Sequence, residues 1–204
     1  MRPQPAVRPR DAASLILLRA GNNGPEVLMG RRASRHRFVP GHFVFPGGRV
    51  DAGDHRAKVL SPLRAAVAKQ LSASCPPAKA TGMAVAAVRE PYEETGLVLG
   101  DLRQGLLLPS LDRLEYVLRA ITPSASPIRF HARFFLADGN ACSGELTSNG
   151  ELLDLAWRSL GESLTLPLVD VTQYILECLQ KDARCFEAGA AALYSFVKGR
   201  ARVR

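Results

Sequence analysis

The sequence predicts a single α/β domain in which helices cover a mixed sheet, and three observations support this fold class. The chain has 204 residues, 47% hydrophobic and 23% charged, which suits one globular domain with a proper core. Segments with strand character and segments with helical character alternate irregularly, as expected of a mixed sheet covered by helices. No internal repeat or linker divides residues 11–204, and we expect residues 1–10 to be a disordered basic tail.

Apolar runs rich in β-branched residues predict the strands. The first two should pair as a hairpin about the turn Gly-Asn-Asn-Gly-Pro, and the third is stopped by a proline and two glycines. The expected strands are 12–20, 26–32, 43–48, 129–137 and 153–160.

Alanine-rich and amphipathic segments predict the helices. The sequence Cys-Pro-Pro must end the first of them, and Gly96 is the residue type that closes a helix in the left-handed conformation. Thr81 is the expected N-cap of the helix that ends at Gly96. The other helices are expected at 61–72, 168–180 and 187–199.

Composition narrows the classes of function. No run of 18 apolar residues is present, so we expect no membrane span. The four cysteines lack the spacing of a metal site or a disulfide framework and suggest free thiols in a reducing compartment, the cytoplasm. The net charge of +8 suits an anionic ligand, although part of it lies in the two ends of the chain. Nucleic acid is disfavoured because no basic surface interleaved with aromatic residues is visible.

The stretch Val-Arg-Glu-Pro-Tyr-Glu-Glu-Thr-Gly-Leu, residues 88–97, crowds three glutamates together. On a helix, Glu93 and Glu94 lie about 60° and about 40° either side of Glu90, so the carboxylates share an arc of about 100°. Their repulsion costs a few tenths of a kcal/mol per pair. Either a cation offsets this repulsion or the glutamates form a solvated face. Divalent hard cations need several carboxylate oxygens that converge on one point, and this arc supplies them.

Together with an earlier glycine turn, this stretch resembles a split Nudix box. The family pattern is G-x5-E-x7-R-E-U-x-E-E-x-G-U, where U is aliphatic. Gly48 begins it, Asp54 stands where glutamate is usual, and Arg89 opens the second half after 27 additional residues, about 55–81. Pro91 replaces an aliphatic residue and should kink the helix or delay its regular part to about Arg89. The resemblance implies a Nudix-type α/β/α sandwich with a helical insertion.

The same resemblance implies a metal site and its residues. Glu90, Glu93 and Glu94 would bind Mg²⁺, or alternatively Mn²⁺, together with the carbonyl of Gly48. The metal would neutralise a substrate diphosphate and activate a water. Arg89 would orient the glutamates by ion pairing. A further glutamate outside the box would act as general base or extra ligand, and Glu151 is the expected one, with Glu145 and Glu115 as competitors.

A second motif concerns the substrate. Residues 28–48 resemble the segment that precedes the Nudix box in coenzyme A diphosphatases, L-L-T-x-R-[SA]-x3-R-x3-G-x3-F-P-G-G, with departures at Met29 and Gly30. Arginines are the natural clamps for phosphate oxygens, so Arg32 and Arg37 are expected to bind the substrate, unless this is a basic solvated loop. The glycines Gly47 and Gly48 would let the backbone approach the metal site closely.

The leading function is therefore Mg²⁺-dependent hydrolysis of coenzyme A or acyl-coenzyme A to 3′,5′-ADP and 4′-phosphopantetheine or its acyl derivative. One alternative is a hydrolase of ADP-ribose, a dinucleotide or another nucleoside diphosphate derivative. Another is a catalytically weak nucleotide-binding module, and a protein that acts on capped RNA has the least support. The resemblance allows a homodimer. The chain ends Arg-Val-Arg, which does not support a peroxisomal address.

Overall fold

One mixed sheet with helices against both faces forms the core of the fold. The structure is a computed structural model, and it describes residues 7–35, 38–182, 186, 192–197 and 200–203. The strands are β1 (Arg10–Gly21), β2 (Gly24–Arg32), β3 (Phe43–Val44), β4 (Gly47–Arg49), β5 (Gly100–Arg103), β6 (Leu106–Pro109), β7 (Glu115–Ile121), β8 (Phe130–Asp138), β9 (Leu152–Ser159), β10 (Ala192–Val197) and β11 (Arg200–Val203). The helices are α1 (Ala65–Ser72), α2 (Pro77–Thr95), α3 (Leu160–Ser163) and α4 (Asp170–Lys181).

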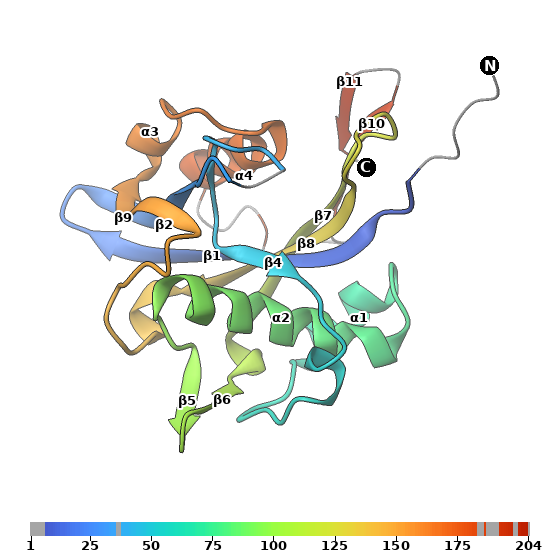
Figure 1. Cartoon of the computed structure of the whole chain (residues 1–204), viewed down its shortest axis with the longest axis vertical. Helices are drawn as coiled ribbons and strands as arrows, with labels where there is room; N and C mark the ends of the chain where they lie inside the picture. Colours follow the sequence, from blue (N-terminus) through green and yellow to red (C-terminus); the bar gives the residue numbers. More distant parts are fainter. Residues whose placement is uncertain (1–6, 36–37, 183–185, 187–191, 198–199, 204) are drawn as a thin grey trace.

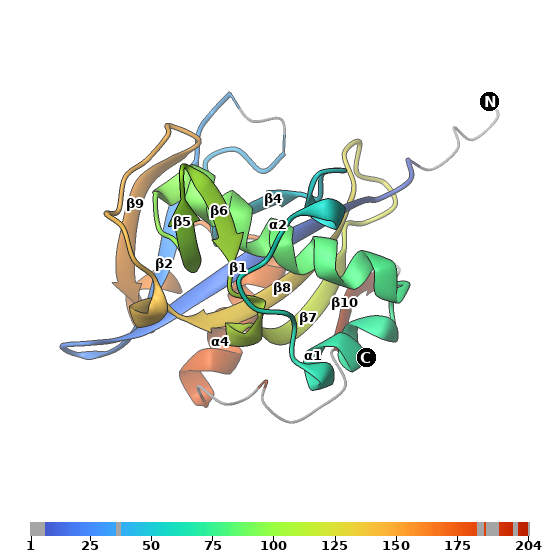
Figure 2. The same ribbon diagram turned by 90° about the horizontal axis from the view of Figure 1, so that it is seen from below.

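The sheet has the strand order β11-β10-β7-β8-β1-β2-β3, with β4 beside β1 and β9 beside β2. The pairs β1–β8 and β7–β10 are parallel and the other pairs are antiparallel, so the sheet is mixed. The strands β5 and β6 form a separate hairpin. In Figure 1 the helix α2 lies on one side of the sheet and α4 on the other, and Figure 2 looks onto the side covered by α2 and α1. The predicted fold class is confirmed.

Strand β1 runs through the middle of the sheet and divides the core into two layers. Successive side chains of a strand point to opposite faces. Accordingly, Leu15 and Leu17 are buried against α1 and α2, whereas Ile16 is buried against α4. The neighbours Phe134 and Phe135 on β8 separate in the same way, and both are core residues.

The helix that carries the glutamates differs from its prediction at the start. It begins at Pro77, and Thr81 lies inside it rather than capping it. Proline is favoured in the first turn of a helix because its missing N–H has no intrahelical partner there. The helix continues through Pro91 as one element. Its predicted end is confirmed, since Gly96 has φ of 73° and its N–H donates to the carbonyl of Tyr92.

Three other boundaries also differ from expectation. The first helix begins at Ala65 and not at Ser61, which pairs with Ser110 instead. The expected strand 43–48 is divided into β3, which pairs with β2, and β4, which pairs with β1. The expected tail ends earlier than Arg10, which already belongs to β1, and residues 1–6 lie outside the described residues.

The predicted helix 187–199 is wrong where the structure describes it. Residues 192–197 form β10, which pairs with β7 through Tyr194 and Ala120. The spacing of two between Tyr194 and Phe196 is the period of a strand, and this outweighs the helix propensity of the preceding alanines. Residues 187–191 and 198–199 lie outside the described residues. No described helix is long and apolar enough to cross a membrane.

A buried cationic cluster links the insertion to the sheet. Arg133 is 1% exposed, and its Nη1 donates to Asp11 at 2.6 Å and to the carbonyl of His131 at 3.0 Å. Its Nη2 donates to the carbonyl of Ser74, between α1 and α2, at 3.4 Å. The pKa of His131 is lowered to about 4, mainly by burial and in addition by the charges of Arg133 and Arg119. His131 is therefore neutral in the folded protein at neutral pH.

The protein should lose stability through His131 as the pH falls from about 6.5 to about 4. In this window the unfolded chain binds a proton at this residue and the folded chain does not, so stability increases with pH. We expect His131→Gln to remove on the order of 1–3 kcal/mol of this acid-induced loss. Urea unfolding at pH 7 and pH 4.5 measures it, with the exposed His55→Gln as the control. Equal losses in the wild type and His131→Gln would contradict the assignment.

Candidate active site

The glutamates of α2 converge on the glycine turn of β4. The carboxylate of Glu94 is buried, and its Oε2 accepts a hydrogen bond from the N–H of Gly47 at 2.8 Å. A Cβ atom on Gly48 would lie 2.3 Å from Oε2 of Glu90. Gly47 has φ of +153°, and a Cβ atom there would lie 2.4 Å from the carbonyl oxygen of Ala13. Backbone atoms leave no room for a side chain at Gly47, and a side chain at Gly48 would displace the Glu90 carboxylate, so the two glycines let the turn lie close to the carboxylates.

Arg89 organises the acidic residues through both halves of the split motif. Its Nε and Nη2 donate to the two carboxylate oxygens of Asp54 at 2.7 and 3.0 Å. Its Nη1 donates to Glu90 at 3.0 Å and to Glu93 at 2.9 Å. Its Nη2 also donates to the carbonyl of Arg49 at 3.0 Å. The guanidinium fork thus joins the loop before the insertion to the helix after it, and binds two of the three glutamates.

Asp54 fulfils this role despite being one methylene shorter than the usual glutamate. It is 3% exposed, and besides Arg89 it accepts a hydrogen bond from the N–H of Asp51 at 2.7 Å. The 3₁₀ turn Asp54–Arg56 packs against α2 and brings the carboxylate within reach. The hydrogen bonds to Asp54 are the main reason that the pKa of Arg89 is raised.

Arg89 offsets only part of the negative charge of the cluster. The pKa of Glu94 is raised to about 8, mainly by burial, against the effect of the Gly47 N–H, and the nearby charge of Glu90 contributes to the rise. Burial also raises the pKa of Glu90, although Arg89 opposes this. The folded protein therefore holds one buried carboxylate, Glu94, and one half-buried carboxylate, Glu90, whose ionised forms are poorly compensated. A bound cation would stabilise both.

The donor set suits a hard divalent cation. In the described part of the chain, no group of three or more histidine, cysteine, aspartate or glutamate side chains is already arranged to hold a metal ion. Arg89 holds Glu90 and Glu93, and Gly47 holds Glu94. These carboxylates nevertheless line one cavity, and carboxylate oxygens are the ligands that Mg²⁺ and related ions take. We conclude that the residues present fit a divalent cation.

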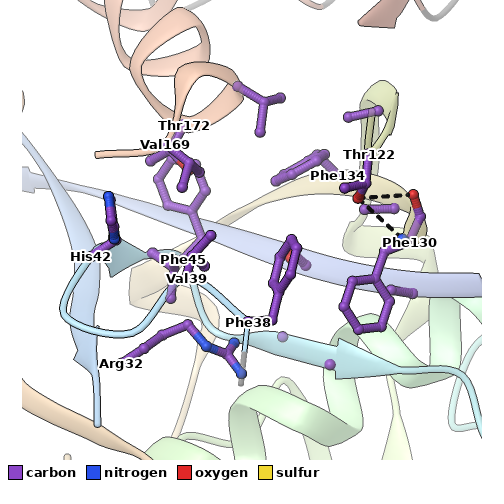
Figure 3. Close-up of a pocket in the computed structure, with 18 of the residues that line it drawn as sticks. Arg32, Phe38, Val39, His42, Phe45, Thr122, Phe130, Phe134, Val169 and Thr172 are labelled. Carbon is purple, nitrogen blue, oxygen red and sulfur yellow. Dashed lines mark hydrogen bonds between the residues drawn. The ribbon is translucent and has the colours of Figure 1, made fainter. Parts of the chain in front are cut away.

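A cavity of about 830 Å³ opens beside these carboxylates. Glu151 and Arg32 also line it, and the backbone brings them together because the N–H of Ala33 donates to the carbonyl of Glu151 at 3.1 Å. The charge of Arg32 acts on Glu94 and opposes the rise of its pKa. Figure 3 shows the Arg32 guanidinium extending into the space below Val39 and Phe38.

The competing glutamates lie elsewhere. Glu115 pairs with Arg64, and Glu145 is exposed in the loop before β9; neither lines the cavity. The predicted phosphate ligand Arg37 lies outside the described residues. The structure therefore brings Glu151 to the glutamate cluster.

The apolar part of the cavity wall could not be predicted from the sequence. Its residues come from the loop after β2, from β7, β8 and β10, and from the start of α4. They are ordinary core types such as phenylalanine, valine and alanine, and no spacing in the sequence links them. Only the alternation along each strand could have indicated their common face.

Asp54→Asn should destabilise the protein by about 2 kcal/mol, because the buried fork of Arg89 loses its ionised partner. Urea unfolding measures this loss. The control is Asp51→Asn, since that carboxylate lies 3.9 Å from Arg89 with 72% of its side chain exposed; a change within about 0.5 kcal/mol is expected there. If both variants unfold alike, the Asp54–Arg89 pair does not hold the motif together.

Comparison with known proteins identifies the superfamily. No family model matches the chain. A Nudix hydrolase from Alicyclobacillus acidocaldarius has a similar structure, with a TM-score of 0.68 and 28% identity, covering 85% of this chain and 91% of that one. A MutT Nudix hydrolase from Burkholderia pseudomallei shares the fold, with a TM-score of 0.52 and 22% identity over 84% of this chain and 98% of that one.

One curated relative is similar in sequence over part of its length. It is the acyl-coenzyme A diphosphatase NUDT19 of Gallus gallus, with 32% identity over 121 aligned residues. The match covers 44% of this chain and 32% of the relative. The chain thus spans about a third of the relative's length. With the Arg89-centred glutamate cluster and the sheet described above, these similarities lead to one conclusion: the chain is a member of the Nudix hydrolase superfamily.

Proposed function

We propose that this Nudix hydrolase cleaves the diphosphate of coenzyme A or of an acyl-coenzyme A. The products would be 3′,5′-ADP and 4′-phosphopantetheine or its acyl derivative. The observation that carries the proposal is the glutamate cluster held by Arg89 at the end of a large cavity. A diphosphate needs a concentration of positive charge to bind, and this acidic cluster supplies it only with a metal ion.

The glutamates of α2 and Arg89 have different roles in the proposed reaction. Glu90, Glu93 and Glu94 would hold Mg²⁺ with the carbonyl of Gly48. When bound, the metal supplies charge neutralisation of the diphosphate and an activated water. Arg89 fixes the direction of two carboxylates and does not itself extend to the substrate, because its five N–H groups face Asp54, the glutamates and the carbonyl of Arg49.

Glu151 is the proposed general base or additional ligand. It comes from the loop before β9 and lines the same cavity as the α2 glutamates. Its negative charge acts on Glu94 and raises the pKa of that residue. The two carboxylates are therefore electrostatically coupled, as expected of groups that serve one metal–water centre.

Two observations favour coenzyme A over other nucleotides. Arg32 stands at the carboxylate end of the cavity, where a guanidinium can bind phosphate oxygens. The curated relative is named as an acyl-coenzyme A diphosphatase. A hydrolase of ADP-ribose or of a dinucleotide is the alternative, and it would leave the arginine loop dispensable. Homodimer formation and a cytoplasmic location stay predictions.

A binding module without catalysis is the less favoured alternative. Two departures from the family pattern would favour it, Pro91 inside the helix and Asp54 in place of a glutamate. However, α2 continues through Pro91, and Asp54 reaches both sides of the Arg89 fork. Neither departure from the family pattern disperses the glutamates, and a retained cluster of repelling carboxylates favours an active metal site.

Hydrolysis should be tested with Mg²⁺ on coenzyme A, acetyl-coenzyme A, ADP-ribose, NADH and a diadenosine polyphosphate. We expect the coenzyme A compounds to be cleaved fastest. Glu93→Gln and Glu94→Gln should each lower kcat by about 100-fold or more, because each removes a charged metal ligand. Glu145→Gln, an exposed glutamate outside the cavity, should stay within about two-fold of the wild type.

The same panel separates the alternatives. Fastest cleavage of ADP-ribose or a dinucleotide would contradict the coenzyme A assignment and leave the metal site intact. Binding of nucleotides without any cleavage would identify a binding module. Unchanged activity in both glutamine variants would remove the proposed metal site.

Arg32→Gln should lower kcat/KM for coenzyme A by about 10- to 100-fold, the effect of losing a charge-assisted hydrogen bond to phosphate. The matched control is Arg31→Gln, next to it on β2, where the guanidinium pairs with Asp154 and does not line the cavity. Steady-state kinetics on both variants measures the difference. If Arg32→Gln behaves like Arg31→Gln, the arginine does not bind the substrate.

A further inference from the structure

The cavity extends well beyond the carboxylates and ends in an apolar region. Diphosphate chemistry does not use such a surface, so another part of the ligand must account for it. Figure 3 shows the rings of Phe38, Phe45, Phe130 and Phe134 gathered around one space. The walls of this region, which we call the apolar end, include Phe38, Ile121, Phe130, Phe134, Val171 and Phe196.

A row of alanines forms the floor of the cavity. Ala12 on β1 pairs with Ala132 on β8, Ala132 pairs with Ala120 on β7, and Ala120 pairs with Tyr194 on β10. All four line the cavity. Residues paired directly across neighbouring strands lie side by side on one face, so three methyl groups in succession leave a trough over the sheet. Tyr194 closes the row at the far strand.

The distance from the glycine turn to the far strand of the trough is comparable to the reach of a pantetheine arm. From β4, which carries Gly48, to β10 the sheet advances by four strand spacings, about 19 Å. The arm between the phosphate and the sulfur of coenzyme A has about as many backbone bonds as four to five extended residues, a reach of about 15 Å. A substrate with its diphosphate at Gly48 can therefore bring its thioester close to β7 and β10.

We propose that the apolar end binds the acyl chain of an acyl-coenzyme A, and that β7 and β10 set the chain length it accepts. This inference rests on the proposed function and adds a specificity to it. The carboxylate end and the apolar end belong to one continuous cavity, so a single ligand with a charged centre and a hydrocarbon end matches both.

Two polar residues beside the aromatic walls, Thr122 and Tyr194, favour a hydrocarbon over a nucleobase, while the polar residues Ser126, Asp170 and Thr172 also line the cavity. The Thr122 hydroxyl already accepts a hydrogen bond from the N–H of Phe130 at 3.0 Å and donates to its carbonyl at 3.3 Å. Tyr194 is 5% exposed and its ring packs between those of Tyr174 and Phe196, at 5.5 and 5.9 Å. A buried base would leave donors and acceptors of its edge unpaired here, whereas an acyl chain has none.

The outer wall is held in place by a strained loop. Val39 has φ of 44°, a left-handed conformation that is rare for a β-branched residue. Its neighbour Phe38 stands edge-on to Phe130, with ring centroids 4.9 Å apart and an angle of 75° between the planes. The strained backbone of Val39 thus lies next to Phe38, whose aromatic ring covers the cavity.

The test is kcat/KM for coenzyme A and its acetyl, octanoyl and dodecanoyl thioesters. Each fully buried methylene adds up to about four-fold, so even with partial burial octanoyl should exceed acetyl by at least about ten-fold in the wild type. Ala120→Leu fills the trough and should reduce this ratio to about one. Phe196→Ala opens the end and should raise the dodecanoyl-to-octanoyl ratio about five-fold. The matched control Ala156→Leu, at a half-buried alanine of β9 outside the cavity, should leave all ratios unchanged.

Opposite shifts in the two variants exclude a general loss of folding. Equal kcat/KM for all thioesters in an active wild type would overturn the acyl site and leave the proposed hydrolysis intact. Loss of 3′,5′-ADP binding in Ala120→Leu, with an unchanged octanoyl-to-acetyl ratio, would assign the apolar end to the base and overturn the proposal.

Calorimetric titration of Glu93→Gln makes the test independent of turnover. Octanoyl-coenzyme A should bind at least about ten-fold more tightly than coenzyme A and with a more negative heat-capacity change, the mark of buried apolar surface. Equal dissociation constants and heat-capacity changes would overturn the acyl site. A protein that binds the octanoyl thioester more tightly but cleaves nothing would retain this site and disprove the hydrolysis.

Discussion

The fork of hydrogen bonds from Arg89 is the interaction on which the candidate active site depends. One guanidinium binds Asp54 before the insertion, Glu90 and Glu93 after it, and the carbonyl of Arg49 in the glycine loop. Only a planar, permanently charged group with five donors can join four partners in this way. The inserted segment, which contains α1 and the first turn of α2, can therefore separate the two halves of the motif in sequence without separating them in space.

The glycine turn supplies the complementary constraint. Gly48 leaves room for the Glu90 carboxylate, and Gly47 both donates to Glu94 and passes close to β1. Burial here has an electrostatic consequence, since it raises the pKa values of Glu90 and Glu94. The protein tolerates this cost in the part of the cavity where a cation can offset it. At the other end the alanine floor and the aromatic walls are mostly apolar, with Asp170 at the start of α4 as a charged lining residue, so that one cavity joins two contrasting environments.

Much of this could be predicted from the sequence, and the failures have physical causes. Local signals were sufficient for the strands β1, β2, β8 and β9, for the end of α2 at Gly96 and for the convergence of the α2 glutamates, because each depends on residues close in the chain. The predicted start of α2 after Thr81 is wrong because the chain is already helical from Pro77, and proline is favoured in the first turn of a helix. The C-terminal helix was wrong because strand pairing with β7 decides the structure of residues 192–197. The strands β5, β6 and β7 and the alanine floor were missed, since they are defined by partners far away in the sequence.

The most direct test of the central claim is a titration of the wild-type protein with Mn²⁺, followed by electron paramagnetic resonance. If the cluster that Arg89 organises is a cation site, Mn²⁺ should bind in the absence of substrate and be displaced by Mg²⁺. Mn²⁺ binding should weaken by at least about ten-fold in Glu94→Gln, because that variant loses one of the charged ligands of the cation. Mn²⁺ binding should stay unchanged in Glu145→Gln. Equal binding in the wild type and Glu94→Gln, or no binding in either, would contradict the claim.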